Sequence, residues 1–195
     1  MLNSKMALKA IEAQLSPPLI RHVCQVAETA QKMARLYRVD EEKAYMAGIL
    51  HDYAKEKPQT EILKIAAENN LLDDVYRQVP YLLHAPVGAL LIKTELGIDD
   101  EELIIAISNH TLGRPFMSDL EKIIFLADMI EPDRNFPEVN KLRNLAEKDL
   151  DEAMLFGLDS TLKYCLDKKS IIHPQTIMAR NYFLAQMASN NYNES

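Results

Sequence analysis

Several residue types are scarce in this 195-residue sequence, and each scarcity excludes a class of protein. The two cysteines, Cys24 and Cys165, lie in apolar helical patterns without a CxxC partner, which excludes a disulfide framework and fits a reducing cytoplasm. No run of about 18 apolar residues occurs, so no membrane span is expected. The mixed N-terminal segment lacks the apolar core of a signal peptide. We therefore expect a cytoplasmic protein.

Positive charge is also in short supply. The 22 Lys and Arg residues are outnumbered by 29 Asp and Glu residues, and the formal net charge is −7. Nucleic-acid backbones are bound by basic surfaces, so we expect no nucleic-acid partner. A small phosphorylated ligand is compatible with this charge, because a few local cations or metal ions can dominate a pocket.

Glycine is rare, with five residues, and no segment alternates polar and apolar residues long enough to indicate a sheet. Helix-start signals recur instead, such as Ser16 before two prolines and the capping-box pattern of residues 118–121. These signals predict an all-α fold with helices near residues 17–37, 40–52, 60–68, 69–78, 84–96, 100–110, 119–130, 137–146, 149–167 and 174–188. The expected cap residues are Ser16, Asp40, Thr60, Asp99 or Asp100, and Ser118.

No repeat, low-complexity segment or Gly/Pro/Ser-rich linker divides the chain. The prediction is one helical bundle over residues 1–195, with a core of about 17–188 and a polar C-terminal tail. Leu8 and Ile11 are expected to be exposed apolar residues of a first helix, which would support a homodimer.

Histidine is the residue type that carries the chemistry. Four of the five histidines, His22, His51, His84 and His110, fall at or near predicted helix ends or on helix faces. Asp52 follows His51 directly, and Asp128 lies in a helix that is apolar on most sides, where an unpaired carboxylate is costly. A metal ion is one suitable partner for Asp128, and an arginine is another.

Four imidazoles and two carboxylates form a borderline ligand set, which suits iron, manganese, zinc, nickel or cobalt better than calcium. Six ligands are too many for one tetrahedral catalytic zinc with an open position. They suit two ions that share a carboxylate, and two ions about 3.5–4 Å apart can clamp a phosphoryl group for in-line attack. Each residue alone has an ordinary structural explanation, so the prediction rests on the joint pattern H…HD…H…H…D.

This pattern resembles the HD-domain phosphohydrolase superfamily. Longer strings are similar to the bacterial YqeK family over about residues 17–185: AGILHDYAK, LLHAPVGA, ISNHTLG, MSDLEKIIFLADMIEPDRNFP, LRNLAEKDLDEA and HPQTIMARN. The resemblance implies a helical HD-type bundle and symmetrical hydrolysis of dinucleoside tetraphosphates, with diadenosine tetraphosphate giving two ADP. It also implies an iron-type dinuclear centre. One ion would be held by His22, His51, Asp52 and Asp128, and the other by His84 and His110, with Asp52 bridging.

The resemblance extends to the expected substrate contacts. Lys55 and Arg134 would bind phosphate, although Lys55 could be a solvated surface residue and Arg134 could pair with Asp133. Thr111 could donate a hydroxyl to a phosphate, and Gln25 lies one turn after His22 on the same helix face. The expected catalytic residues are Asp52, Lys55, His84 and His110, and His84, His110 and Asp128 would also touch the substrate.

Residues 171–176 resemble the wall that holds one nucleoside. Ile171 and Ile172 would pack on a purine, and Thr176 or backbone groups would read its edge or sugar. His173 would be a pocket residue, or else a helix-start histidine without a role. The full segment is Ile171, Ile172, His173, Pro174, Gln175 and Thr176.

Two alternatives remain open. The chain could be another enzyme of the superfamily, acting on a nucleoside mono- or triphosphate or on a cyclic dinucleotide, although no GYP string follows the HD pair. It could also be a nucleotide-binding protein with a vestigial site, which the intact ligand set disfavours. A small nucleotide or dinucleotide is the expected partner in each case.

Overall fold

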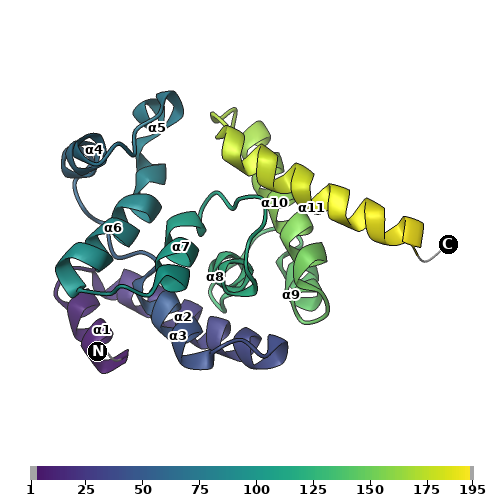
Figure 1. Ribbon diagram of the computed structural model, residues 1–195, viewed down its shortest axis with the longest axis horizontal. Coiled ribbons are helices and arrows are strands. Elements are labelled where there is room, and N and C mark those ends of the chain that lie inside the picture. The colour runs from purple at the N-terminus through teal and green to yellow at the C-terminus, as the bar shows by residue number, and fades with distance from the viewer. Residues whose placement is uncertain (1–3, 194–195) are drawn as a thin grey trace.

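The computed structural model describes residues 4–193, with side chains described for residues 6–189. Within that range the chain forms helices and no strand, as predicted (Figure 1). The helices are α1 (Ser4–Glu12), α2 (Pro17–Tyr37), α3 (Glu41–Leu50), α4 (Gln59–Glu68), α5 (Asp74–Gln78), the short 3-10 helix η1 (Pro80–Leu83), α6 (His84–Leu96), α7 (Glu101–Asn109), α8 (Asp119–Ile130), α9 (Val139–Ala146), α10 (Leu150–Asp167) and α11 (Pro174–Asn193).

Helix α8 lies at the centre of the molecule, where Figure 1 shows it nearly end-on between α7 and α10. It also packs against α2, which in turn packs along α3. Leu120, Ile123, Ile124 and Leu126 of α8 are at most 1% exposed. A helix buried on most sides matches the apolar run in its sequence. In the described part of the chain, no helix is long and apolar enough to span a membrane.

Three of the five predicted cap positions are confirmed by side-chain hydrogen bonds. Asp40 accepts hydrogen bonds from two backbone amides of α3, and Asp100 accepts one from Leu103. Ser118 and Glu121 form the predicted capping box of α8. Asp149 caps α10 in the same way as Asp40 caps α3.

Other local predictions were wrong. The cap position of α4 is Pro58 and not Thr60. Ser16 makes no side-chain cap for α2, because its hydroxyl donates to Glu56 at 2.5 Å. The predicted helix at 69–78 is reduced to α5, which Asp73 caps. Helix α11 continues to Asn193, beyond the predicted end at residue 188, and residues 194–195 of the predicted polar tail lie outside the described residues.

The expectation of an exposed apolar face on the first helix was also wrong. Ile11 is fully buried, and Leu8 packs against the core cluster. Helix α1 contacts α3 and α2, so its apolar residues complete the bundle itself. The sequence argument for a homodimer through these residues therefore has no structural basis.

One glycine allows the close packing of α2 on α3. A Cβ atom on Gly48 would lie 2.5 Å from the Cα of Ala27. Any larger residue would push the two helices apart, because that distance is far below van der Waals contact. This close approach brings the C-terminal end of α3 against Ala27 of α2, five residues after His22.

Candidate functional site

Six predicted residues meet in the interior of the bundle, brought there by five helices or helix ends. His22 lies inside α2 and Asp128 inside α8. His51 is the residue after α3 and His110 the residue after α7, while His84 is the first residue of α6. Asp52 follows His51 in the turn that leaves α3. The three histidines at helix ends and Asp52 are at most 3% exposed.

The carboxylate of Asp52 lies between two pairs of histidines. Its Oδ1 is 3.2 Å from Nε2 of His84 and 3.6 Å from Nε2 of His110. Its Oδ2 is 3.5 Å from Nε2 of His51 and 3.7 Å from Nε2 of His22. One oxygen therefore faces each pair, which is the geometry of a bridging carboxylate.

Asp128 adds a second carboxylate to only one of these pairs. Its Oδ1 is 3.1 Å from Nε2 of His22 and 4.0 Å from Nε2 of His51. Potential ligand atoms of His22, His51 and Asp128 lie within 4.8 Å of one another, and so do those of His51, Asp52 and His110. The cluster thus contains two overlapping groups with metal-ligand spacing.

Backbone carbonyls fix the ring orientation of three histidines. Nδ1 of His51 donates to the carbonyl of Gly48 at 2.8 Å, Nδ1 of His84 to that of Tyr81 at 2.6 Å, and Nδ1 of His110 to that of Ile107 at 2.7 Å. A carbonyl only accepts, so each Nδ1 carries the proton. When such a ring is neutral, its lone pair lies on Nε2, the nitrogen that faces the centre of the cluster.

The side chains fit a divalent metal site. Nε2 of His51 and Oδ1 of Asp52 are buried without a hydrogen-bond partner, which is costly in the absence of a ligand. Nε2 of His84 and Nε2 of His110 are only 3.2 Å apart. Lone pairs converging on one point are stabilised by a cation, and imidazole with carboxylate suits borderline transition metals.

Electrostatics favour ionised carboxylates on Asp52 and Asp128 and a neutral His110, which are states that metal ligands need. Burial works against charge on Asp52, but His51, His110 and His84 hold its pKa well below the usual range. Burial also opposes charge on Asp128, but its contact with His22 and the nearby charges hold its pKa far below normal. Burial lowers the pKa of His110 to about 4. Both carboxylates are therefore ionised and His110 is neutral at pH 7.

Lys55 and Thr111 lie beside the His84 half of the cluster. Nζ of Lys55 is 3.3 Å from Oδ1 of Asp52 and 3.2 Å from Nε2 of His84. The Thr111 hydroxyl lies 3.3 Å from Nε2 of His84 and 3.2 Å from Nε2 of His110. The Lys55 side chain is 42% exposed, so the ammonium lies at the entrance of the site and not on a remote surface.

Arg134 contacts the cluster through Asp128 and does not pair with Asp133, the alternative partner in the sequence. Its guanidinium bonds the side chain of Asp128, and its Nε donates to the Asp128 carbonyl at 2.7 Å. The alternative partner, Asp133, is instead 3.5 Å from Arg21. The arginine and the carboxylate predicted as separate site residues therefore form one ion pair at the edge of the cluster.

Two groups near the site were missed by sequence reasoning. Glu131 is 3% exposed, and its Oε1 lies 3.3 Å from Nδ1 of His22. Asp73 accepts a hydrogen bond of 2.9 Å from Nε2 of His173. The available signal for Glu131 was an acidic residue directly after a buried helix, and for Asp73 it was the cap position of α5.

The predicted nucleoside segment, residues 171–176, comprises the end of the α10–α11 connection and the first turn of α11. His173 is buried, contacts the ring of Tyr76 with centroids 4.8 Å apart, and accepts a hydrogen bond from the Gln175 amide at 3.2 Å. The Gln175 side chain donates to Asn109 and to the Gly113 carbonyl at 3.1 and 2.6 Å. The segment is thus tied to α5 on one side and to the α7–α8 loop on the other.

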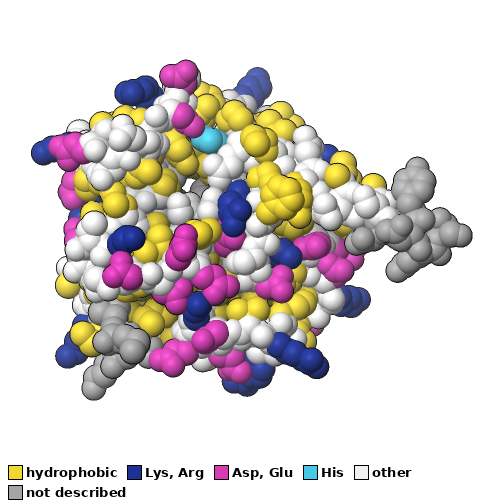
Figure 2. Space-filling view, viewed as in Figure 1, with side chains coloured by type: hydrophobic (Ala, Val, Ile, Leu, Met, Phe, Trp, Pro, Cys, Tyr) yellow, Lys and Arg dark blue, Asp and Glu magenta, His cyan; other side chains and the backbone are white. Residues whose placement is uncertain are grey.

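The remaining predicted contacts differ in exposure. Ile171 is 45% exposed and Pro174 is exposed, whereas Ile172 is half-buried. Thr176 is 2% exposed, so its hydroxyl lies below the surface and not on an open wall. Oε1 of Gln25, one turn from His22, is buried without a hydrogen-bond partner. Hydrophobic side chains continue along α11 in Figure 2, where Ile177, Met178 and Leu184 are exposed.

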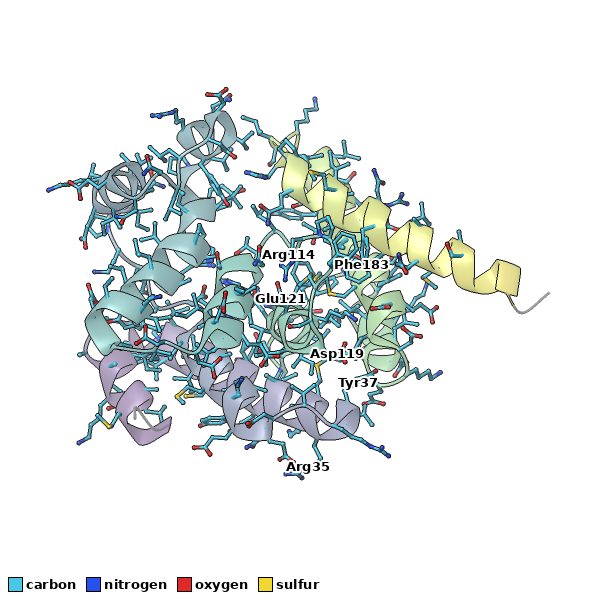
Figure 3. The ribbon with its side chains drawn as sticks, viewed as in Figure 1. Arg35, Tyr37, Arg114, Asp119, Glu121 and Phe183 are labelled. Carbon is cyan, nitrogen blue, oxygen red and sulfur yellow. The ribbon has the colours of Figure 1, made fainter. Side chains whose placement is uncertain are left out.

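A surface hollow of about 350 Å³ lies elsewhere, between α7 and the start of α8. Its lining is mostly charged and comprises Glu101, Glu102, Ile105, Arg114, Ser118 and Glu121. Arg114 and Glu121 lie close together in Figure 3 and form a two-pronged ion pair at 2.6 Å. Two of the charged lining residues therefore satisfy each other, and none of the six clustered residues lines the hollow.

Comparison with known proteins agrees with this geometry. A family model described as HD domain matches residues 19–133, a range that contains all six clustered residues. The symmetrical bis(5'-nucleosyl)-tetraphosphatase of Halalkalibacterium halodurans is 42% identical over 185 residues, which is 95% of this chain and 99% of that protein. The Bacillus subtilis protein of the same name is 38% identical over 94% of this chain and 99% of its own length.

A solved structure is similar throughout. The crystal structure of a predicted HD superfamily hydrolase involved in NAD metabolism from Clostridium acetobutylicum superposes with a TM-score of 0.92 at 41% identity, over 95% of this chain and 99% of that chain. The chain therefore belongs to the HD domain family, within the YqeK-type group that its relatives of 34–42% identity represent.

Proposed function

We propose that this protein hydrolyses dinucleoside tetraphosphates symmetrically, so that diadenosine tetraphosphate yields two ADP. The observation that carries the proposal is the carboxylate of Asp52 between two histidine pairs, in a chain whose full-length relatives are named symmetrical bis(5'-nucleosyl)-tetraphosphatases. In the reaction, the oxygen of one water bonds to a phosphorus of the central linkage as the central phosphorus–oxygen bond breaks. Each product carries two phosphates.

The proposed cofactor is a pair of divalent ions, with iron as the first candidate and manganese, cobalt, nickel or zinc as fits to the same donors. His22, His51 and Asp128 would hold one ion, His84 and His110 the other, and Asp52 both. When bound, such ions neutralise phosphoryl charge and make water more acidic. The enclosed position of the ligands supports this assignment, because Asp52, His51, His84 and His110 are at most 3% exposed.

Three polar side chains at the edge of the cluster would position the phosphates. Lys55 supplies an ammonium beside Asp52 and His84, and Thr111 supplies a hydroxyl beside His84 and His110. Arg134 supplies a planar guanidinium beside Asp128. Charge-assisted hydrogen bonds from these groups would neutralise the chain of phosphates and hold its central linkage at the ligand cluster.

The nucleoside would lie toward the α10–α11 connection. Ile171 and Ile172 offer apolar surface next to the buried His173, and the ties to α5 and to the α7–α8 loop hold this connection in place. Gln25 has a buried side-chain oxygen without a partner near His22. It is proposed to contact the ligand from the α2 side.

A product assay tests the proposed function. Protein loaded with iron or manganese should convert diadenosine tetraphosphate to ADP without forming AMP and ATP. The Asp52→Ala variant should lose metal and at least about 100-fold in kcat, as expected when preorganised charge stabilisation is removed. Asp159→Asn is a matched control, because Asp159 is half-exposed and its ion pair is with Arg180 of α11 and not with one of the six clustered residues. A metal-loaded protein that forms no ADP would overturn the proposal.

A second function has one observation in its favour. The Clostridium acetobutylicum protein is described as involved in NAD metabolism, so dinucleotides with two phosphates belong in the substrate panel, beside nucleoside mono- and triphosphates. The same ligand cluster would serve any of them, and only the pocket would discriminate. Preference for a two-phosphate dinucleotide over the tetraphosphate by kcat/KM would favour this alternative.

A further inference from the structure

The fourth histidine of the cluster is oriented differently from the other three. His51 and His110 follow the last turns of α3 and α7, where carbonyl groups lack a full set of intrahelical partners. His84 uses the carbonyl of Tyr81 in η1. His22 lies in the interior of α2, where backbone carbonyls are occupied by the helix itself. Its Nδ1 therefore needs a side chain as acceptor.

Glu131 provides that acceptor from a segment 109 residues away in the sequence. Its Oε1 is 3.3 Å from Nδ1 of His22, and its side chain is only 4% exposed. Oε2 accepts a 2.6 Å hydrogen bond from the Asp133 amide, which leaves Oε1 directed at the histidine. A buried carboxylate is costly unless its oxygens are paired, and here each oxygen has a partner.

The same carboxylate lies beside a second group of the site. Oε1 of Glu131 is 3.7 Å from Nε of Arg134, whose guanidinium bonds Asp128. The segment that contains both residues is held from α9 by Arg143, which donates to the carbonyls of Glu131 and Arg134 at 2.9 and 3.1 Å. The backbone around Glu131 is thus held in place by Arg143, and the Glu131 side chain contacts both His22 and Arg134.

We propose that Glu131 is a positioning residue that holds His22 in the tautomer with a bare Nε2 and thereby strengthens metal binding. A carboxylate partner on the outer nitrogen makes an imidazole a more basic ligand, and loss of such a partner costs about 10–100-fold in metal affinity. The inference rests on the metal centre of the proposed function. Glu131 lies outside the six proposed ligands, and its effect is expected on the ion that His22, His51 and Asp128 would hold.

The test measures metal binding without substrate. The affinity for Zn²⁺ is measured by competition with a chelator for the wild type, Glu131→Ala and Glu131→Gln. We expect Glu131→Ala to weaken the binding of one ion by about 10–100-fold. We expect Glu131→Gln to lose less, because its amide oxygen still accepts from Nδ1. Imidazole ¹⁵N spectra of the zinc-loaded proteins should show the His22 Nδ1–H signal in the wild type and its loss or displacement in Glu131→Ala.

Glu121→Gln is the matched control. Glu121 is a carboxylate that is 1% exposed, bound by Arg114 and the Ser118 amide, and outside the ligand cluster. The Glu121→Gln variant should have a lower thermal stability than the wild type and the same zinc affinity. If Glu131→Ala lowered thermal stability without weakening zinc binding, as expected of this control, the positioning role would be overturned. The same holds if the variant kept both the zinc affinity and the His22 signal of the wild type. If the wild type bound no metal, the proposed function itself would fail instead.

Discussion

The two oxygens of the Asp52 carboxylate differ in their neighbours, and Lys55 contacts only one of them. Nζ of Lys55 approaches Oδ1, the oxygen that faces His84 and His110. The ammonium therefore lies on the side of the cluster that includes Thr111 and is furthest from Arg134. A phosphate chain crossing the cluster would meet a cation at each end.

At the residue scale, this arrangement makes the role of Lys55 testable. Replacing Lys55 with Gln should leave zinc content intact and reduce kcat/KM for diadenosine tetraphosphate by about 10–150-fold, the value of one hydrogen bond to a charged group. Lys57→Gln is the control, because Lys57 pairs with Glu61 at 2.9 Å. Steady-state kinetics with metal analysis of the same samples measures the effect. Equal rates for the Lys55 and Lys57 variants would show Lys55 to be a solvated surface residue.

At the element scale, the short α5 and the start of α11 are joined across the sequence. Nε2 of His173 donates to Oδ2 of Asp73, and Tyr76 of α5 packs on the same imidazole. Val79, Leu82 and Leu112 form a separate apolar cluster that ties the α5–η1 segment to the α7–α8 loop. The wall proposed to hold the nucleoside is therefore assembled from three segments, and its shape depends on the contact between α5 and the α10–α11 connection.

A double-mutant cycle on this contact should reveal coupling. Asp73→Asn keeps the cap of α5, since Asn caps as well as Asp, but loses the charge that faces His173. Together with His173→Ala it should show a coupling of about 0.5–3 kcal/mol in unfolding free energy. The single variants should raise the KM for the dinucleotide and leave zinc affinity unchanged. Asp74→Asn is the neighbouring control, and additive effects with an unchanged KM would contradict the prediction.

Local patterns predicted the helices and the six clustered residues because both are encoded locally. Caps, prolines and the 3.6-residue period mark where helices begin and end, and histidine is rare enough for four placements to stand out. The pairs His22–Glu131 and Asp73–His173 are 109 and 100 residues apart, and no local pattern joins them. The burial of Ile11 was mispredicted for the same reason, since it depends on where α1 packs.

At the scale of the whole molecule, the ligand residues extend from His22 to Asp128 and come from five helices or their ends. Such a centre exists only when the bundle has formed. A metal ion held by these residues would therefore bind the native state and not the unfolded chain, and its binding would raise the free energy of unfolding. The core of α2, α3 and α8 is apolar and buried without any contribution from the ligands, so the bundle should fold in the presence of a chelator.

Metal removal should accordingly lower the melting temperature without unfolding the protein at 25 °C. An ion at 1,000 times its Kd contributes about 4 kcal/mol. For a chain of this size that corresponds to about 8–16 °C in Tm. Circular dichroism melting curves with zinc and with a chelator measure the shift. Asp52→Ala should show no zinc-dependent shift, and an identical Tm for the wild type in both conditions would exclude a tightly bound ion.

The orientation of the four imidazoles has a consequence for how the gene tolerates mutation. Three rings take their partners from the main chain of Gly48, Tyr81 and Ile107, so a codon change at Tyr81 or Ile107 alters a side chain and keeps the acceptor. Only His22 depends on a side chain, that of Glu131. A library of single substitutions scored for metal loading should thus be permissive toward polarity changes at Tyr81 and intolerant at Glu131. Both residues face the Nδ1 of a clustered histidine, but Tyr81 does so with its backbone and Glu131 with its side chain.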